Sequence, residues 1–169
     1  MKKLVLALLL MLLQLCTACS ETTYHSNEEI GRAFQRHKST FENVAVSAVG
    51  ENSGYIHKPD AEGQETECGD SGCKLMEADG LHIHLQREMS DTELRHIAEA
   101  ALALMENVDI ESISFSQEAV RFHLKDESEY SWDPTIVYWR ADDADEGKIG
   151  YGEAVCRLAD HWYAALITR

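Results

Sequence analysis

Residues 90–125, SDTELRHIAEAALALMENVDIESISFSQEAVRFHLK, decide the fold class because a helix signal passes directly into two strand signals. An S-x-x-E capping box begins at Ser90, and apolar residues then recur at helical spacing, so we predict a helix over residues 91–106. "ESISFS" and "AVRFHLK" alternate with a period of two and flank a short turn at residues 117–118, which predicts two antiparallel strands. Their inward-facing residues would be Ile113, Phe115, Val120, Phe122 and Leu124.

Upstream of this stretch, some segments have regularly spaced apolar residues and others do not. A second S-x-x-E box at Ser26 and apolar residues at helical spacing predict a helix of about three turns. "VAVSAV" at residues 44–49 predicts a short buried strand, and "LHIHLQR" at residues 81–87 predicts a strand with one apolar and one polar face. Residues 50–80 show no period, so we expect a long loop there.

Downstream, "PTIVYWR" at residues 134–140 predicts another strand that begins at Pro134. A last helix is expected from about residue 152, with five apolar residues on one side. These are Val155, Leu158, Ala159, Trp162 and Leu166. Since three successive strands lack helical crossovers, we predict an α+β fold, a mostly antiparallel sheet of about five strands with three helices packed on it.

The first 18 residues have the three-part pattern of a secretory signal peptide. Lys2 and Lys3 form a positive region, and "LVLALLLMLL" at residues 4–13 is a short apolar core followed by small residues. The apolar run is too short for a membrane-spanning helix. We therefore expect residues 1–18 to be cleaved.

The small pair Thr17 and Ala18 directly before Cys19 resembles the cleavage site of bacterial lipoproteins. This resemblance covers residues 1–20 and implies that Cys19 is lipidated and becomes the new N-terminus. Ser20, in the second mature position, resembles signals for the outer membrane, which implies a lipid anchor on the periplasmic face of that membrane. An ordinary secreted protein and an uncleaved anchor are the alternatives.

We expect residues 19–25 to be a short tether and residues 26–169 to form a single globular α+β domain, because no repeat or Pro-rich linker is visible. The signal holds two of the 15 basic residues and none of the 30 acidic ones, which leaves the mature chain with a net charge of −17. This charge excludes nucleic-acid binding, which needs Lys and Arg against phosphate. An acidic surface favours solubility and also attracts a basic partner.

Cys68 and Cys73 enclose "GDSG", the four letters that surround the nucleophilic serine of chymotrypsin-like proteases. The similarity ends there, since no histidine stands in the context that this family uses, so we do not expect Ser71 to be a nucleophile. Cysteines separated by four residues can pair in an oxidising compartment, and we predict a Cys68–Cys73 disulfide that staples the long loop. Cys156 is then either free or the true partner of one of these two.

Histidines support an alternative function. His82 and His84 lie on one face of a predicted strand, and His123 lies on the polar face of another. Three histidines around an open position suit a catalytic zinc, so a metal-dependent periplasmic hydrolase is one alternative. The simpler interpretation is that these histidines occupy solvent-facing positions. We therefore assign no metal, cofactor or catalytic residue.

Residues 130–140, "YSWDPTIVYWR", are rich in aromatic residues. Strand alternation places Tyr138 and Arg140 on one side and Val137 with Trp139 on the other, and Tyr and Arg are residue types enriched at protein interfaces. An acidic turn follows. We predict a protein-binding surface made of Trp132, Tyr138, Arg140, Asp142, Asp143, Asp145 and Glu146.

Location, charge and the lack of a catalytic constellation lead us to expect a non-enzymatic, membrane-anchored protein-binding module. Its partner would be a basic protein of the envelope. The module would act as an inhibitor or immunity protein against a cationic periplasmic enzyme or toxin. A structural subunit of an outer-membrane assembly is a further alternative.

Overall fold

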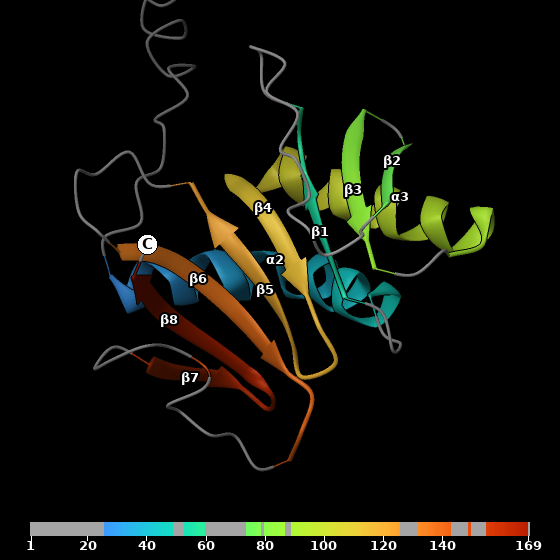
Figure 1. Cartoon of the computed structure of the whole chain (residues 1–169). Coiled ribbons are helices and arrows are strands. Elements are labelled where there is room, and N and C mark those ends of the chain that lie inside the picture. The colour runs from blue at the N-terminus through green and yellow to red at the C-terminus, as the bar shows by residue number, and fades with distance from the viewer. Residues whose placement is uncertain are drawn as a thin grey trace, which may run out of the picture.

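The fold was obtained as a computed structural model that describes residues 26–48, 53–59, 74–78, 80–86, 89–125, 132–142, 149 and 155–168. The elements in chain order are α2 (Asn27–Ser47), β1 (Gly54–His57), β2 (Lys74–Ala78), β3 (Leu81–Leu85), α3 (Asp91–Asn107), β4 (Ile110–Phe115), β5 (Ala119–Leu124), β6 (Trp132–Trp139), β7 (Val155–Ala159) and β8 (Trp162–Thr168). The strands form one sheet, and Figure 1 shows both helices behind it, on the same face.

The sheet is antiparallel throughout, with the strand order β2-β3-β1-β4-β5-β6-β8-β7. The α+β class and the antiparallel arrangement are thus confirmed. The detail of the prediction is wrong, because the described residues contain eight strands and two helices rather than about five strands and three helices. α2 packs on β6, β7 and β8, whereas α3 packs on β2, β3 and β4.

The predicted strand at residues 44–49 is wrong, because α2 continues to Ser47. Apolar residues keep the helical spacing through this region and pack into the core. They are Phe41, Val44, Ala45 and Ala48, all buried. Valine costs a helix only up to about 0.7 kcal/mol per residue, which burial of this face outweighs. The helix is kinked at His37, whose φ of −118° and ψ of 20° are not helical.

The expected loop at residues 50–80 contains two strands, β1 and β2. β1 alternates over only three residues and β2 does not alternate, so neither shows a clear period in the sequence. β2 pairs with the next strand, β3, whereas β1 pairs with β3 and β4, which are distant in sequence.

The predicted last helix is also wrong, because β7 and β8 form a hairpin there. The turn between them contains His161 at φ 64°, a left-handed conformation that ends β7. Apolar residues of β8 alternate to both sides of the sheet, with Trp162 and Ala164 toward the helices and Tyr163 and Ala165 away from them. A strand with two apolar faces gives a continuous run that resembles a helix in sequence.

The central prediction is confirmed. α3 begins after a capping box in which Ser90 and Glu93 satisfy each other's backbone amides, and β4 and β5 follow as a hairpin. β6 is confirmed as a strand, although it begins at Trp132, so Pro134 is its third residue.

The main core lies between the sheet and the two helices. One register row of fully buried residues crosses five strands, through Ile83, Ile56, Ile113, Phe122 and Ile136. Rings from α2 pack on this side of the sheet, with Phe41 edge-on to Phe122 at 5.0 Å and Phe34 tilted against Trp162 of β8 at 4.9 Å between ring centroids. A second, smaller apolar cluster lies on the other face of the sheet. It comprises Ala119, Val137, Trp139, Ile149, Tyr163 and Ala165.

Candidate functional site

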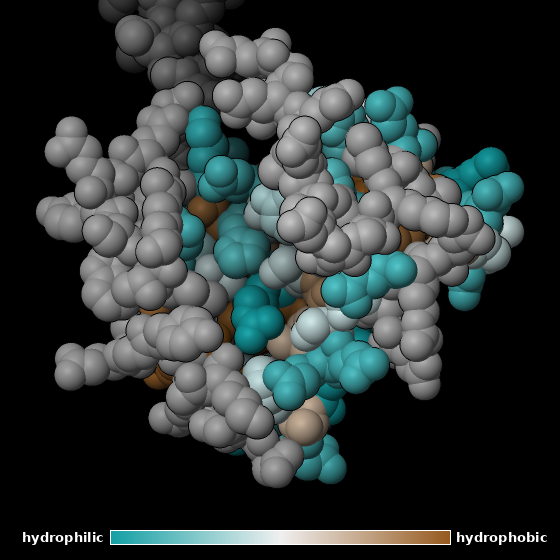
Figure 2. All heavy atoms as spheres, in the orientation of Figure 1, coloured by the Kyte–Doolittle hydropathy of each residue, from teal (hydrophilic) through white to brown (hydrophobic). Residues whose placement is uncertain are grey.

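The helix-free face presents polar side chains over β3, β1, β4 and β5, which the strand register aligns in two rows. One row is Glu77, His82, His57, Ser112, His123 and Thr135. The other is His84, Tyr55, Ser114 and Arg121. Four of the chain's eight histidines lie here, and Figure 2 shows hydrophilic side chains gathered over the middle of this face. We call these two rows the histidine face.

Two buried imidazoles form the centre of the histidine face. His57 is 6% exposed and His84 is 7% exposed. Their Nε2 atoms lie 3.1 Å apart, and the ring planes differ by 14°. His57 Nδ1–H donates to the Lys58 carbonyl oxygen at 2.8 Å, so the neutral ring of His57 has its lone pair on Nε2. His84 Nε2–H is then the donor between the rings.

Three further side chains border this pair. The His82 ring stands edge-on to the His57 ring, with centroids 5.3 Å apart. His82 Nε2 lies 3.7 Å from a carboxylate oxygen of exposed Glu77. The Tyr55 ring lies 5.3 Å from the His57 ring and 6.3 Å from the His84 ring. The pair therefore has an aromatic ring on one side and a third imidazole with a carboxylate on another.

Protonation of His84 is disfavoured. Burial lowers the pKa of His84 below its usual value, and nearby His57 and His82 lower it further. The geometry agrees, because two imidazolium ions cannot share an N–H···N hydrogen bond. Near neutral pH, His84 is therefore held as a neutral imidazole, the form that binds metal ions.

A second polar group joins β4, β5 and β6. Ser114 Oγ and His123 Nε2 form a hydrogen bond of 3.1 Å. Burial lowers the pKa of His123, while the charge of Asp133 opposes this effect and Arg121 adds to it. This pair resembles a nucleophile and its base, but Ser114 lies mid-strand between paired neighbours. Because Ser114 lies mid-strand, the backbone amides around it serve the sheet and form no oxyanion hole, and we assign it no catalysis.

The three histidines proposed as zinc ligands are only partly brought together. His82 and His84 face the helix-free side, as predicted, and both lie beside His57. His123 shares this face, but β1 and β4 separate its strand from β3. Three strand spacings of about 4.8 Å place His123 roughly 14 Å from His82, beyond the reach of one metal ion. Its observed partner is Ser114.

Sequence reasoning missed His57, Tyr55 and Ser114. Tyr55-Ile56-His57 has the same polar–apolar alternation as His82-Ile83-His84, but it lies in the stretch that we interpreted as a loop. A three-residue alternation predicts little alone. The register of β1 between β3 and β4 is what brings His57 to His84.

The predicted protein-binding segment makes mainly internal contacts where it is described. Tyr138 faces the helices and packs on Trp162, with ring centroids 5.0 Å apart. Arg140 Nη2 donates to the carbonyl oxygen of Ala48, at the C-terminus of α2, at 2.6 Å. Asp142 is exposed, with Oδ1 3.7 Å from His161 Nε2. Trp132 opens β6.

Other predicted residues lie outside the described part of the chain. They are Cys19, Cys68, Cys73, Asp143, Asp145 and Glu146. The lipid anchor and the Cys68–Cys73 disulfide therefore stay predictions. Cys156 lies on β7, exposed and free, rather than on a helix.

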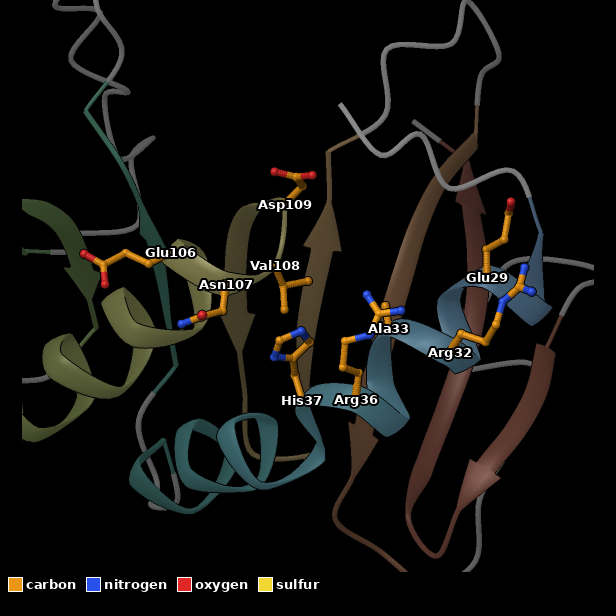
Figure 3. A pocket seen from close by; sticks show the side chains of 9 residues that line it. All are labelled: Glu29, Arg32, Ala33, Arg36, His37, Glu106, Asn107, Val108 and Asp109. Carbon is orange, nitrogen blue, oxygen red and sulfur yellow. The ribbon is translucent and has the colours of Figure 1, made fainter. Parts of the chain in front are cut away.

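A pocket of about 300 Å³ lies between α2 and the end of α3. Figure 3 shows Arg32 and Arg36 on α2 and His37 at the helix kink, below the turn that carries Asp109. The lining combines the guanidinium groups of Arg32 and Arg36 with carboxylates of Glu29, Glu106 and Asp109. Because the charges are of both signs, the pocket does not select for a ligand of one charge.

The exposed surface of α3, the turn after it and the start of β4 is strongly acidic. It carries Asp91, Glu93, Glu99, Glu106, Asp109 and Glu111, all exposed. Within residues 89–111, Arg95 is the one Lys or Arg. α2 differs, because its carboxylates are balanced by basic residues, as in the pairs Arg32–Glu28 and Lys38–Glu42. We call the six carboxylates the acidic α3 surface.

No protein-family model matches this chain, and no curated protein or solved structure is significantly similar to it. Among the described helices, neither is long and apolar enough to cross a membrane.

Proposed function

We propose that the protein is a lipid-anchored envelope protein that binds a basic protein partner and acts on it as an inhibitor or immunity protein. The observation that carries this proposal is the acidic α3 surface, six exposed carboxylates in a segment whose one Lys or Arg is Arg95. Arg32 and Arg36 of α2 line a pocket with Glu106 and Asp109, so the negative charge is partly balanced at that end of the helix. The lipoprotein-like signal around Cys19 and the net charge of −17 expected for the mature chain support it.

Charge complementarity steers the encounter of two proteins and selects partners of opposite sign. Glu99 and Glu106 are two helical turns apart on α3, so their side chains project on the same side. A basic surface of the partner would meet several carboxylates there at once. Tyr138 and Arg140 contribute less in this proposal, because their observed contacts are internal.

A pull-down from envelope extract tests the proposal, with about 0.05 M and about 0.5 M salt compared. We expect a basic partner whose capture falls at the higher salt concentration. The double variant Glu99→Lys/Glu106→Lys should reduce capture about tenfold. Glu28→Lys/Glu42→Lys on α2 is the matched control, since it changes net charge equally.

Two results would contradict the proposal. One is a captured partner that is acidic or insensitive to salt. The other is an equal loss of capture in both double variants, because total charge rather than the acidic α3 surface would then control binding.

A further inference from the structure

We propose that His57 and His84 bind one divalent transition-metal ion through their Nε2 atoms. This site is separate from the acidic α3 surface and goes beyond the protein-binding function. The observation behind it is the pair of buried imidazoles whose Nε2 atoms face each other at 3.1 Å.

The distance between the two nitrogens fits a shared metal ion. Zinc binds histidine nitrogen at about 2.0–2.1 Å, so two such ligands at a tetrahedral angle lie about 3.3 Å apart. His57 and His84 come from neighbouring strands and are already within a few tenths of an ångström of that separation. Both rings would have to tilt outward, because each Nε2 now points at the other nitrogen rather than at a shared point beside the pair.

The hydrogen bond of His57 to the backbone orients it as a ligand. Its Nδ1–H donates to the Lys58 carbonyl oxygen, which fixes the ring and directs the Nε2 lone pair at His84. Metal-binding histidines typically donate their other N–H to such a carbonyl or carboxylate. When the metal binds, the proton on His84 Nε2 is released, to water or to the other ring nitrogen, and neither an oxidant nor a reductant is needed.

The surroundings favour a cation at this position. His82 brings a third imidazole near the pair, and exposed Glu77 places a carboxylate 3.7 Å from His82 Nε2. Imidazole ligands suit zinc, copper and nickel rather than calcium or magnesium. The described residues hold no preassembled group of three or more ligands, so water, or His82 after a rotation, would complete the shell. We therefore expect weaker binding than at a closed four-ligand site.

Titration of the purified full-length protein, without a histidine tag, with Zn²⁺ and separately with Mg²⁺ tests this site. We expect one Zn²⁺ per chain by calorimetry and no Mg²⁺ binding. His57→Gln and His84→Gln should each weaken zinc binding at least tenfold. His96→Gln is the matched control, since His96 is an exposed histidine on α3 and should leave binding unchanged.

Circular dichroism of each variant shows whether it folds. If a variant does not fold, a measurement on the unaltered chain still tests the site. In ¹⁵N NMR of that chain, the Nε2 signals of His57 and His84 should shift when zinc is added. Unchanged affinity in both variants, an equal loss in His96→Gln, or imidazole signals that ignore zinc would each overturn the site. Partner capture is measured without added metal, so failure here leaves the protein-binding proposal to its own test.

Discussion

The two faces of the central sheet are built from the same strands but carry opposite chemistry. On the helix-covered face, the row from Ile83 through Phe122 to Ile136 is fully buried and entirely apolar. One position along each strand, the histidine face carries imidazoles and hydroxyls, among them His57 and Thr135, which are also buried. Burial alone therefore does not distinguish the two faces.

The difference separates what folding requires from what it does not. An apolar row between sheet and helices follows from the hydrophobic effect. A buried polar row has no such origin, because burying a polar group costs free energy unless the group is hydrogen-bonded. The same helix-free face becomes apolar over β6 and β8, where Val137, Trp139 and Tyr163 cluster with Ile149. Polar residues over β1, β3, β4 and β5 are thus not imposed by the topology, which favours a binding role for them.

The largest expected effect comes from removing one ring of the covered face. Phe122→Ala should lower the free energy of unfolding by about 3–5 kcal/mol, because it empties the space between Phe41 and Trp162. His123→Ala, on the next residue of β5, should cost clearly less. Urea unfolding of both variants measures the contrast. If the His123 variant loses as much stability as the Phe122 variant, the histidine face is a second structural core and the comparison fails.

Gly54→Ala should disturb both faces through one methyl group. A Cβ at Gly54 would lie 2.5 Å from the His84 carbonyl oxygen and 2.5 Å from Phe115 Cζ, so β1 must shift. We expect a loss of about 1–3 kcal/mol in unfolding free energy, together with weaker zinc binding because His57 shifts with β1. Gly31→Ala in α2 is the control, since the nearest atom would be 3.4 Å away and alanine favours the helix by up to about 1 kcal/mol. Unfolding curves that show Gly54→Ala to be neutral would mean that β1 is less tightly held than its contacts indicate.

The covered face was largely predictable, and the reason is local. α3 is indicated by its capping box and by apolar residues that recur at helical spacing over many residues. The β4–β5 hairpin is indicated by alternating apolar and polar residues around a short turn. The errors occurred where tertiary contacts outweigh local preference. Residues 44–47 are helical because Phe41, Val44 and Ala48 share a buried side, although valine favours strands. β8 resembles a helix in sequence because both of its faces are apolar.

The histidine face was predictable only as single strands. Alternation placed His82, His84 and His123 on polar sides, and this is confirmed. Which histidines meet depends on the order of the strands in the sheet. β1 comes before β2 and β3 in the chain, but in the sheet it lies between β3 and β4. Nothing local encodes that insertion, so His57 was missed and His123 was grouped with residues that it does not approach.

A smaller effect is expected at the N-terminus of α3, where we can test whether the cap stabilises the covered face without affecting the histidine face. Ser90 Oγ accepts from the Glu93 amide, and the Glu93 carboxylate accepts from the Ser90 amide. Ser90→Ala should therefore lower the unfolding free energy by about 1 kcal/mol, with zinc affinity unchanged. Thermal unfolding and calorimetry measure the two quantities on the same sample. A change in zinc affinity that matches the loss of stability would mean that the two faces are energetically coupled.

The smallest effect concerns protonation of the histidine face. Burial lowers the pKa values of both His84 and His123 in the folded protein, so between these values and the ordinary value of about 6.5 the unfolded chain binds more protons. Stability from these two groups is therefore complete above about pH 6.5 and is lost as the pH falls toward their folded pKa values. His123→Gln keeps a hydrogen-bonding group near Ser114 but cannot titrate, so its urea midpoint should change less between pH 7.5 and pH 5.5 than that of the unaltered protein. His96→Gln on exposed α3 should keep the original slope, and a slope that is the same in all three proteins would show that burial of His123 does not contribute to the pH dependence of stability.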